Sequence, residues 1–279
     1  MIGAYVVETS EGPALFDCGP ATCLPALKEG LTARGLELTD IRHLLLSHIH
    51  LDHAGAAGTL VREHPGLQVH VSEVGAPHLV DPSRLEASAR RIYGDAFDPL
   101  WGELAPIPAE NVHVARDGRL GLECFPTPGH ASHHVSYLGG DGTLYAGDAT
   151  GVRILPGHSV FPHAPPPDLD LSAWSRTLDE IETRRPERLA LIHFGVAHDV
   201  TDHLGRTREA LARWAERIHA GMTEDEFVSA GRRDLAASDP ELADTYAKAA
   251  PLPQSYAGLN RHRAKEEELR RTAEESAAA

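Results

Sequence analysis

Residues 47–54 read Ser-His-Ile-His-Leu-Asp-His-Ala and place three imidazoles and a carboxylate within six positions, directly after three consecutive leucines. The leucine run contains no turn residue and the motif is followed by Ala-Gly-Ala-Ala-Gly, which predicts a buried strand that ends at His48 and gives way to a helix. If the chain stays extended through His50, both side chains project from one face, because side chains alternate along a strand. Asp52 and His53 then lie at the bend and point to a second spot nearby. The pattern therefore predicts one pair of ligands for each of two neighbouring metal ions.

Three further polar residues follow apolar β-like runs elsewhere in the chain. His130 comes after the turn sequence Thr-Pro-Gly, Asp148 follows the expected strand 143–146, and His193 ends the apolar run 189–192. Polar side chains at the ends of separate strands can converge on one edge of a sheet. A solvated polar loop at 47–54 is the alternative, and it is disfavoured because these residues add matching ligand types.

Composition limits the class of protein. The 279 residues are 42% hydrophobic, as in a globular protein, and the formal net charge is −15. Basic residues do not cluster before 261–265, so we expect no nucleic-acid partner, because nucleic-acid binding depends on neutralising phosphates.

The compartment follows from the cysteines and from the start of the chain. The three cysteines lack CxxC spacing, which favours reduced thiols. No basic segment with a long apolar stretch precedes the first strand, so we expect no signal peptide, no membrane span and a cytoplasmic location.

The remaining pattern predicts alternating strands and helices, followed by helices alone. We expect strands at 5–8, 14–16, 40–46, 67–71, 120–125, 134–138, 143–146 and 189–192. We expect helices at 24–34, 54–64, 84–94, 171–181, 204–218 and 223–237. Residues 75–110 are interpreted as an insertion over the site with one helix, and the segment from 263 as a polar helix or a frayed tail.

The order His-x-His-x-Asp-His, Thr-Pro-Gly-His, Gly-Asp and a late His resembles the metallo-β-lactamase superfamily, and more narrowly its glyoxalase II and lactonase-type hydrolases. The resemblance covers roughly residues 4–198. It implies an α/β protein with the four-layer αββα fold, two mixed sheets packed together with helices outside and metals at one edge. Residues 1–198 would form the catalytic domain, and residues 199–279 a C-terminal helical extension with a polar tail. Relatives often have an earlier strand than the one at Tyr5, which leaves a late start of this sequence open.

The resemblance also implies a ligand for every position of a dinuclear centre. His48, His50 and His130 would bind one metal, Asp52, His53 and His193 the other, and Asp148 would bridge them. Imidazole and carboxylate ligands suit two divalent ions, with zinc preferred and iron or manganese as alternatives. Asp52 would in addition orient the attacking hydroxide, and no residue is assigned as the general acid.

The function implied is hydrolysis of a small-molecule ester, thioester or lactone by a metal-activated water. A phosphodiesterase or nuclease on the same site and a mononuclear-iron persulfide dioxygenase are the alternatives. Antibiotic hydrolysis is not expected, because the β-lactamases of this superfamily use a different second-site set and are exported. Diiron flavoproteins usually carry Glu at the position of His50.

Several other side chains have two interpretations each. Asp17, His133 and His134 either support the ligands or serve in turns and packing, and His163 and Tyr137 either contact substrate or pack. His70 is expected to be packed or exposed rather than a ligand. The aromatic residues Tyr93, Phe97 and Trp101 of the insertion are expected in the core rather than at the substrate. The C-terminal helices would narrow the site or mediate a homodimer.

Overall fold

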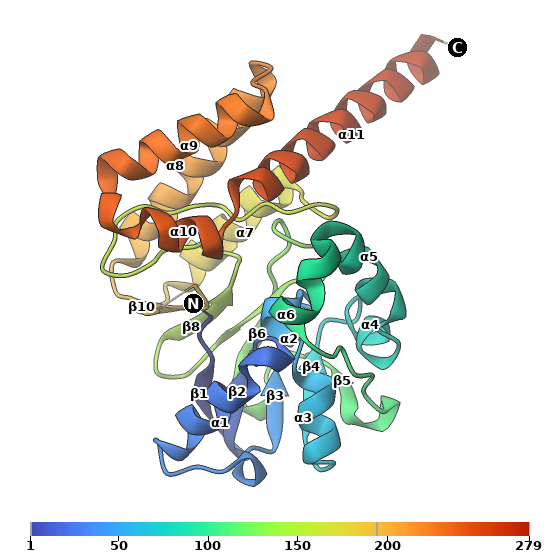
Figure 1. The fold of residues 1–279 in the computed structure, drawn as a ribbon, viewed down its shortest axis with the longest axis vertical. Helices are drawn as coiled ribbons and strands as arrows, with labels where there is room; N and C mark the ends of the chain where they lie inside the picture. Colours follow the sequence, from blue (N-terminus) through green and yellow to red (C-terminus); the bar gives the residue numbers. More distant parts are fainter. Residues whose placement is uncertain (1, 194, 279) are drawn as a thin grey trace.

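The computed structural model describes residues 2–193 and 195–278, and it contains two mixed β-sheets that pack face to face with helices outside (Figure 1). The first sheet has the order β1 (Tyr5–Thr9), β2 (Gly12–Phe16), β3 (His43–Leu45), β4 (Gln68–Val71) and β5 (Val112–Val114). The second has the order β10 (Gly195–Ala197), β9 (Arg188–Leu191), β8 (Thr143–Gly147), β7 (Val135–Leu138) and β6 (Glu123–Pro126). This is the predicted αββα fold.

The first sheet begins as a hairpin and continues with parallel strands. β1 and β2 are antiparallel, whereas β2, β3, β4 and β5 run parallel to one another. Parallel neighbours need crossovers. Here α1 (Leu24–Thr32) connects β2 to β3, α2 (Leu51–Ala54) and α3 (Ala57–Glu63) connect β3 to β4, and the insertion connects β4 to β5. The apolar sides of α1 and α3 pack on the outer face of the sheet.

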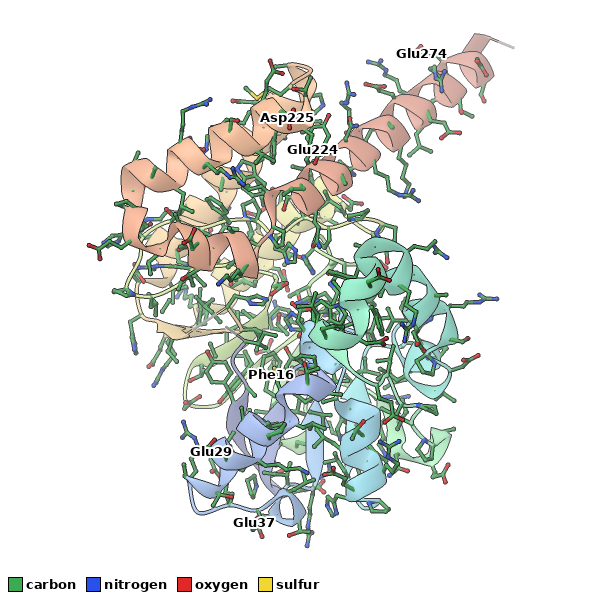
Figure 2. The ribbon with its side chains drawn as sticks, viewed as in Figure 1. Phe16, Glu29, Glu37, Glu224, Asp225 and Glu274 are labelled. Atoms are coloured by element: carbon green, nitrogen blue, oxygen red, sulfur yellow. The ribbon has the colours of Figure 1, made fainter. Side chains whose placement is uncertain are left out.

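Apolar side chains from both sheets fill the space between them. Phe16 is fully buried there, and its ring contacts Tyr137 and Tyr145 of the second sheet at centroid distances of 5.9 and 5.4 Å. Figure 2 shows Phe16 inside the body, whereas Glu29 and Glu37 lie at its outer end. The alternation of inward apolar residues along β2 and β7 thus produces the contact between the sheets.

Five helices cover the second sheet and the ends of its strands. They are α7 (Leu171–Arg184), α8 (Val200–His219), α9 (Glu224–Ser238), α10 (Ala243–Ala249) and α11 (Leu252–Ala278). Trp174 of α7 shares one apolar cluster with Trp214, Phe227 and Tyr246 of the later helices. The far half of α11 extends away from the body in Figure 1. The division of the chain after residue 198 stays a prediction.

The helix predicted at 84–94 is present as α5 (Ser83–Tyr93), and the insertion contains two further helices that were not predicted, α4 (Ala76–Val80) and α6 (Phe97–Trp101). The prolines that suggested irregular chain, Pro77 and Pro99, lie in the first turns of α4 and α6. A proline costs little there, because the first backbone N–H groups of a helix have no partner within it.

The boundaries near the motif also differ from the prediction. β3 ends at Leu45, so residues 46–50 form a loop rather than the end of a strand. The strands β5 and β10 were not predicted, since each has only three residues, and β5 in addition depends on pairing with the distant strand β4. Across the described part of the chain, none of the helices combines the length and the apolar character that a membrane crossing requires.

Candidate metal centre

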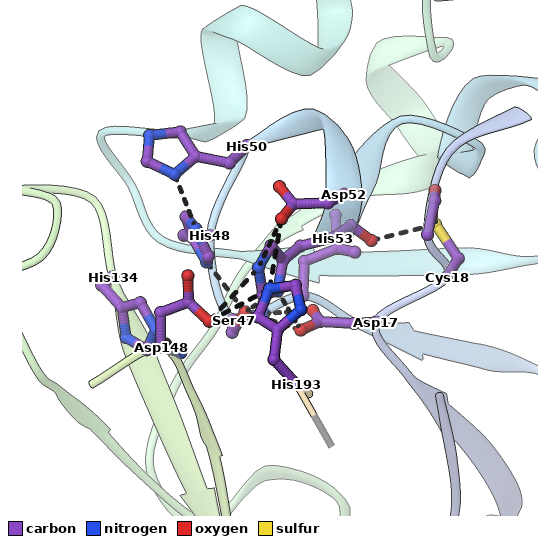
Figure 3. A network of polar contacts seen from close by, with 12 residues as sticks. Asp17, Cys18, Ser47, His48, His50, Asp52, His53, His134, Asp148 and His193 are labelled. Carbon is purple, nitrogen blue, oxygen red and sulfur yellow. Dashed lines mark hydrogen bonds and ion pairs between the residues drawn. The ribbon is translucent and has the colours of Figure 1, made fainter. Parts of the chain in front are cut away.

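The seven predicted ligands lie at one edge of the paired sheets. His48 and His50 follow β3, and Asp52 and His53 form the middle of α2, whose four residues begin directly after His50. His130, Asp148 and His193 follow strands of the second sheet, β6, β8 and β9. Figure 3 shows Asp148 and His193 of the second sheet beside His48, Asp52 and His53. The expectation that strand ends bring them together is therefore met.

Their ligand atoms form three groups of three, of which two share no residue and the third joins Asp148 with His48 and His53. In the first group, His48, His50 and His130, the Nδ1 atom of His50 lies 2.9 Å from His48 Nε2 and 3.0 Å from His130 Nε2. In the second group, Asp52, His53 and His193, Asp52 Oδ2 lies 3.3 Å from His193 Nε2 and 3.7 Å from His53 Nε2. Each group has the ligand types and the spacing that could hold a metal ion.

Asp148 stands between the two groups. Its Oδ2 lies 3.4 Å from His130 Nε2 in the first group, and its Oδ1 lies 3.5 Å from His53 Nε2 in the second. The carboxylate is almost fully buried, with 1% of the residue exposed. One oxygen therefore faces each group, which is the arrangement that a bridging ligand needs.

The tautomers of three histidines are fixed by hydrogen bonds on the far side of each ring. The Nδ1 atom of His53 donates to Asp17 Oδ2 over 2.8 Å, and His130 Nδ1 donates to the carbonyl of His163 over 2.7 Å. His48 Nδ1 donates to Ser47 Oγ over 2.9 Å. Because each N–H is used in this way, the Nε2 lone pairs face the centre and are available to a metal.

Asp17 and Ser47 are hydrogen-bonded to each other, and Asp17 also holds His53 of the second group. Asp17 accepts hydrogen bonds from the backbone N–H and the hydroxyl of Ser47, at 2.8 and 2.7 Å, in addition to that from His53. The sequence left Asp17 open between a supporting residue and a turn residue, and the structure places it in both roles, since its φ is 51°. Ser47 carried no distinctive sequence signal beyond its place beside His48.

Charge and burial oppose each other in the pocket. Burial lowers the pKa of His48 and of His50 well below the ordinary value, aided by the neighbouring imidazoles. Burial alone would lower the pKa of His53, but Asp148, Asp52 and Asp17 outweigh it and raise that pKa. Burial would also raise the pKa of Asp52, yet His53 and His193 hold it below the usual range. The carboxylates are therefore kept ionised among imidazoles.

Buried polar atoms without hydrogen-bond partners are a further indication that these residues could hold a metal ion. His53 Nε2 and both carboxylate oxygens of Asp148 are buried and make no hydrogen bond to any described residue. Leaving such atoms unpaired costs about 1–3 kcal/mol each, and more for a charged group. Cations between the two groups would satisfy all of these atoms, and the mixed nitrogen and oxygen donors suit zinc, iron or manganese.

His134 and His133 differ in what they touch. His134 Nε2 accepts a 3.1 Å hydrogen bond from the backbone N–H of Asp148, and its Nδ1 donates to Thr127 Oγ1 over 2.8 Å. His134 therefore positions Asp148, in line with the supporting role considered for it. His133 stacks on His48 at 5.9 Å, and its Nε2 lies 3.8 Å from Asp168.

The other histidine and the tyrosine considered for substrate contact lie in different surroundings. The hydroxyl of Tyr137 lies between the sheets, 3.3 Å from the carbonyl of Leu46, so this side chain packs. His163 lies beside the centre, with its Nδ1 3.7 Å from Asp148 Oδ2. His70 lies away from the centre, buried against His43, whose Nδ1 is 3.0 Å from His70 Nε2.

The aromatic residues of the insertion pack directly on the motif. Phe97 is fully buried with Leu51, the residue between two predicted ligands, as expected for a core residue. Tyr93 and Trp101 are half-buried against the same cluster, with their rings 5.1 Å apart. The hydroxyl of Tyr93 accepts a 3.3 Å hydrogen bond from Gln254 at the start of α11. The insertion is thus joined to the C-terminal helices, a contact that the sequence did not indicate.

The sequence of this chain is similar to those of known proteins. The model of the family described as "Metallo-beta-lactamase superfamily" matches residues 3–193. Among curated proteins, the chain is 29% identical over 157 residues to "Uncharacterized protein YobT" of Bacillus subtilis, covering 54% of this chain and 63% of YobT. The chain spans less than two thirds of the length of the first curated relatives that it matches.

Solved structures share the fold, and two of them illustrate the similarity to this chain. The metallo-beta-lactamase family protein TTHA1429 from Thermus thermophilus superposes with a TM-score of 0.63 at 22% identity, covering 94% of this chain and 86% of that one. The protein TTHA1623, solved in a di-iron-bound form, gives a TM-score of 0.55 at 26% identity, covering 74% and 91%. Because the family model matches more than half of this chain, the chain belongs to the metallo-β-lactamase superfamily.

Proposed function

We propose that the protein is a metal-dependent hydrolase that holds two divalent ions and cleaves a small ester, thioester or lactone. The observation that carries the proposal is the placement of Asp148, whose two oxygens lie 3.4 and 3.5 Å from imidazole nitrogens of two different groups. A single ion would need only one of the groups. The shared carboxylate therefore supports a dinuclear centre over the mononuclear-iron alternative.

The ligand assignment follows the two groups. One ion would be held by His48, His50 and His130, and the other by Asp52, His53 and His193, with Asp148 contacting both. When bound, two such ions supply a water acidified toward a pKa of about 7 and polarise the oxygen of the bond to be cleaved. Zinc is the proposed metal, and the di-iron form of TTHA1623 keeps iron as the alternative.

The chain's own residues give the site its order. Asp17, Ser47 and the carbonyl of His163 hold the rings, so that the ligand atoms need little rearrangement. Asp52 Oδ2 is the donor atom shared by the contacts to His53 and His193, and we assign it the additional task of orienting the attacking water. Tyr93, Trp101 and Leu51 belong to one apolar cluster next to the motif, and this cluster would exclude solvent from the site.

The substrate is proposed to be a small molecule rather than a nucleic acid. The net charge of −15 opposes binding of a polyanion, and the proposal that the substrate carries an acyl bond rests on the resemblance to glyoxalase II and lactonase-type enzymes. The alternative is a phosphodiester substrate, and a hydrolysis assay must distinguish it from an acyl substrate.

The test is a hydrolysis panel on protein stripped of metal and reloaded with zinc. The panel contains 4-nitrophenyl acetate, phenyl thioacetate, δ-valerolactone and bis(4-nitrophenyl) phosphate. We expect zinc-dependent turnover of at least one acyl substrate, abolished in His50→Gln and retained in His219→Gln, a control on the exposed side of α8. Turnover of the phosphodiester alone, or acyl turnover that survives in His50→Gln, would contradict the proposal.

A further inference from the structure

His163 is a buried imidazole that the seven-ligand set does not use. Only 8% of the residue is exposed, and neither ring nitrogen makes a hydrogen bond to a described residue. Its Nδ1 lies 3.7 Å from Asp148 Oδ2, which is longer than a hydrogen bond. An unpaired buried polar group costs about 1–3 kcal/mol, so a folded protein keeps one where something else binds it.

The position of His163 puts this unpaired ring beside the first group. Its carbonyl accepts the 2.7 Å hydrogen bond from His130 Nδ1, and the two rings are 5.7 Å apart. The nearest oxygen of Asp148 is Oδ2, the one that also faces His130 Nε2. His163 nevertheless belongs to none of the three clusters of potential ligand atoms among the described residues. His163 therefore lies next to the predicted ligands His130 and Asp148 without being one of them.

The start of α11 fixes the backbone that carries His163. The backbone N–H of Ala164 donates to Ser255 Oγ over 3.3 Å. A Cβ placed on Gly258 would lie 2.0 Å from the carbonyl oxygen of Ala164, so the helix backbone packs directly against this loop. Because Gln254 of the same turn contacts Tyr93, the first two turns of α11 touch both sides of the centre.

We propose that His163 contacts the substrate, donating a hydrogen bond from its ring to the carbonyl oxygen of the acyl group, and that α11 positions it. This inference rests on the proposed hydrolysis. An imidazole carries at least one N–H in either charge state, so the donor is always present. As the water oxygen bonds to the acyl carbon, the electron pair of the C=O double bond moves onto the carbonyl oxygen. The pair returns when the C–O or C–S bond breaks, and the leaving group takes a proton from the water.

A donor in this place would act mainly on kcat. Charge on the carbonyl oxygen develops only as the bond forms, so a hydrogen bond to it strengthens in the transition state. We expect His163→Ala to lower kcat by about 10²- to 10³-fold with KM little changed. His163→Asn, which keeps an N–H donor, should recover part of the loss. The control is His158→Ala, an exposed histidine of the same loop, which should match the parent protein.

Two readouts separate substrate contact from support of the metal. Elemental analysis should give the same metal content in His163→Ala as in the parent. In the ¹H–¹⁵N spectrum of the imidazoles, the His163 signal, assigned by its absence in the variant, should shift when acetate is added to the zinc-loaded protein. Loss of metal in His163→Ala, unchanged kcat, or no shift with acetate would overturn the inference. If the parent hydrolyses none of the panel, the proposed function fails, while the acetate titration still tests His163.

The role of α11 is tested by coupling. Gly258→Ala should lower kcat in the parent but add little in the His163→Ala background, because both changes act through the same ring. Gly205→Ala, at a glycine of α8 with open space around its Cβ, is the matched control. Ser255→Ala, which removes the acceptor of the Ala164 N–H, replaces Gly258→Ala if that variant does not fold. Fully additive losses would show that α11 does not position His163.

Discussion

Asp17 and His53 are 36 residues apart in the sequence, yet Asp17 Oδ2 accepts a 2.8 Å hydrogen bond from His53 Nδ1 in the buried centre. Asp17 follows β2 and His53 lies in α2, so the parallel pairing of β2 with β3 brings the two segments together. The bond fixes which nitrogen of His53 faces the centre. The second group thus depends on a residue that supplies no ligand atom.

Replacement of Asp17 by Asn should weaken this group selectively. Asn tolerates the positive φ of 51° at this position but loses the carboxylate charge that holds His53 and Ser47. We expect the affinity for one of the two metal ions to fall by about 10- to 100-fold. Competition with a chromophoric chelator measures it, with Asp95→Asn, an exposed residue of the insertion, as control. Equal affinity in Asp17→Asn and the parent would contradict the assignment.

Gly129, directly before His130, should tolerate no side chain. Its φ is +140°, and a Cβ would lie 2.4 Å from the Cα atom of Trp174 in α7. We expect Gly129→Ala to lower the free energy of unfolding in urea by roughly 3 kcal/mol or more, because backbone strain and overpacking add. Gly12 has a φ of +102° with nothing near its Cβ, so Gly12→Ala should cost only the backbone strain, about 1–2 kcal/mol. Equal losses in the two variants would rule out the packing argument.

The buried pair of His43 and His70 should make stability depend on pH. Burial, with His43 as a further cause, lowers the pKa of His70 to about 3, whereas the unfolded chain has the ordinary value of about 6.5. Below pH 6.5 the unfolded chain binds a proton that the folded chain does not, so the stability present above pH 6.5 is lost as the pH falls toward 3. The slope for one such group is about 1.4 kcal/mol per pH unit.

The comparison of the parent with His70→Leu isolates this contribution. Urea unfolding between pH 7 and pH 4.5, with chelator present in both samples, should show a shallower loss of stability in the variant. Parallel curves for the two proteins would mean that His70 is protonated in the folded state.

Metal removal should destabilise the fold. A ligand that binds only the folded state at 100 times its Kd stabilises it by about 2.7 kcal/mol, which corresponds to roughly 5–10 °C in a chain of this size. We therefore expect chelation to lower Tm by at least this amount and added zinc to restore it. Asp148→Asn should respond much less to zinc, since it removes the ligand that faces both groups. A Tm that is indifferent to chelator and zinc would argue against a metal centre in this place.

The sequence indicated which side chains lie together at one edge of the paired sheets because its signal is local. His48, His50, Asp52 and His53 are neighbours in one loop, and the other three candidates each follow an apolar strand. The family resemblance then supplied the layers of the fold, which composition and periodicity alone could not. The short strands β5 and β10 were not predicted because three residues show too little periodicity to indicate a strand.

The supporting residues could not be predicted in the same way. The contact of Asp17 with His53 arises only when β2 pairs with β3. That of His163 with Asp148 arises only when the connection between β8 and α7 folds back on itself through the bridge between Val152 and Phe161. Nothing in the sequence near Gln254 indicates that it reaches Tyr93, because the two residues are 161 positions apart in the chain. Such contacts depend on tertiary packing rather than on local pattern.

The most direct test of the dinuclear hydrolytic centre is elemental analysis of protein purified without added metal, paired with hydrolysis of a thioester and a lactone before and after chelation. We expect close to two zinc, manganese or iron ions per chain, with hydrolysis that is lost on chelation and regained on reloading. About one iron per chain with no hydrolysis in any state would contradict this expectation and favour oxygen chemistry at the same residues.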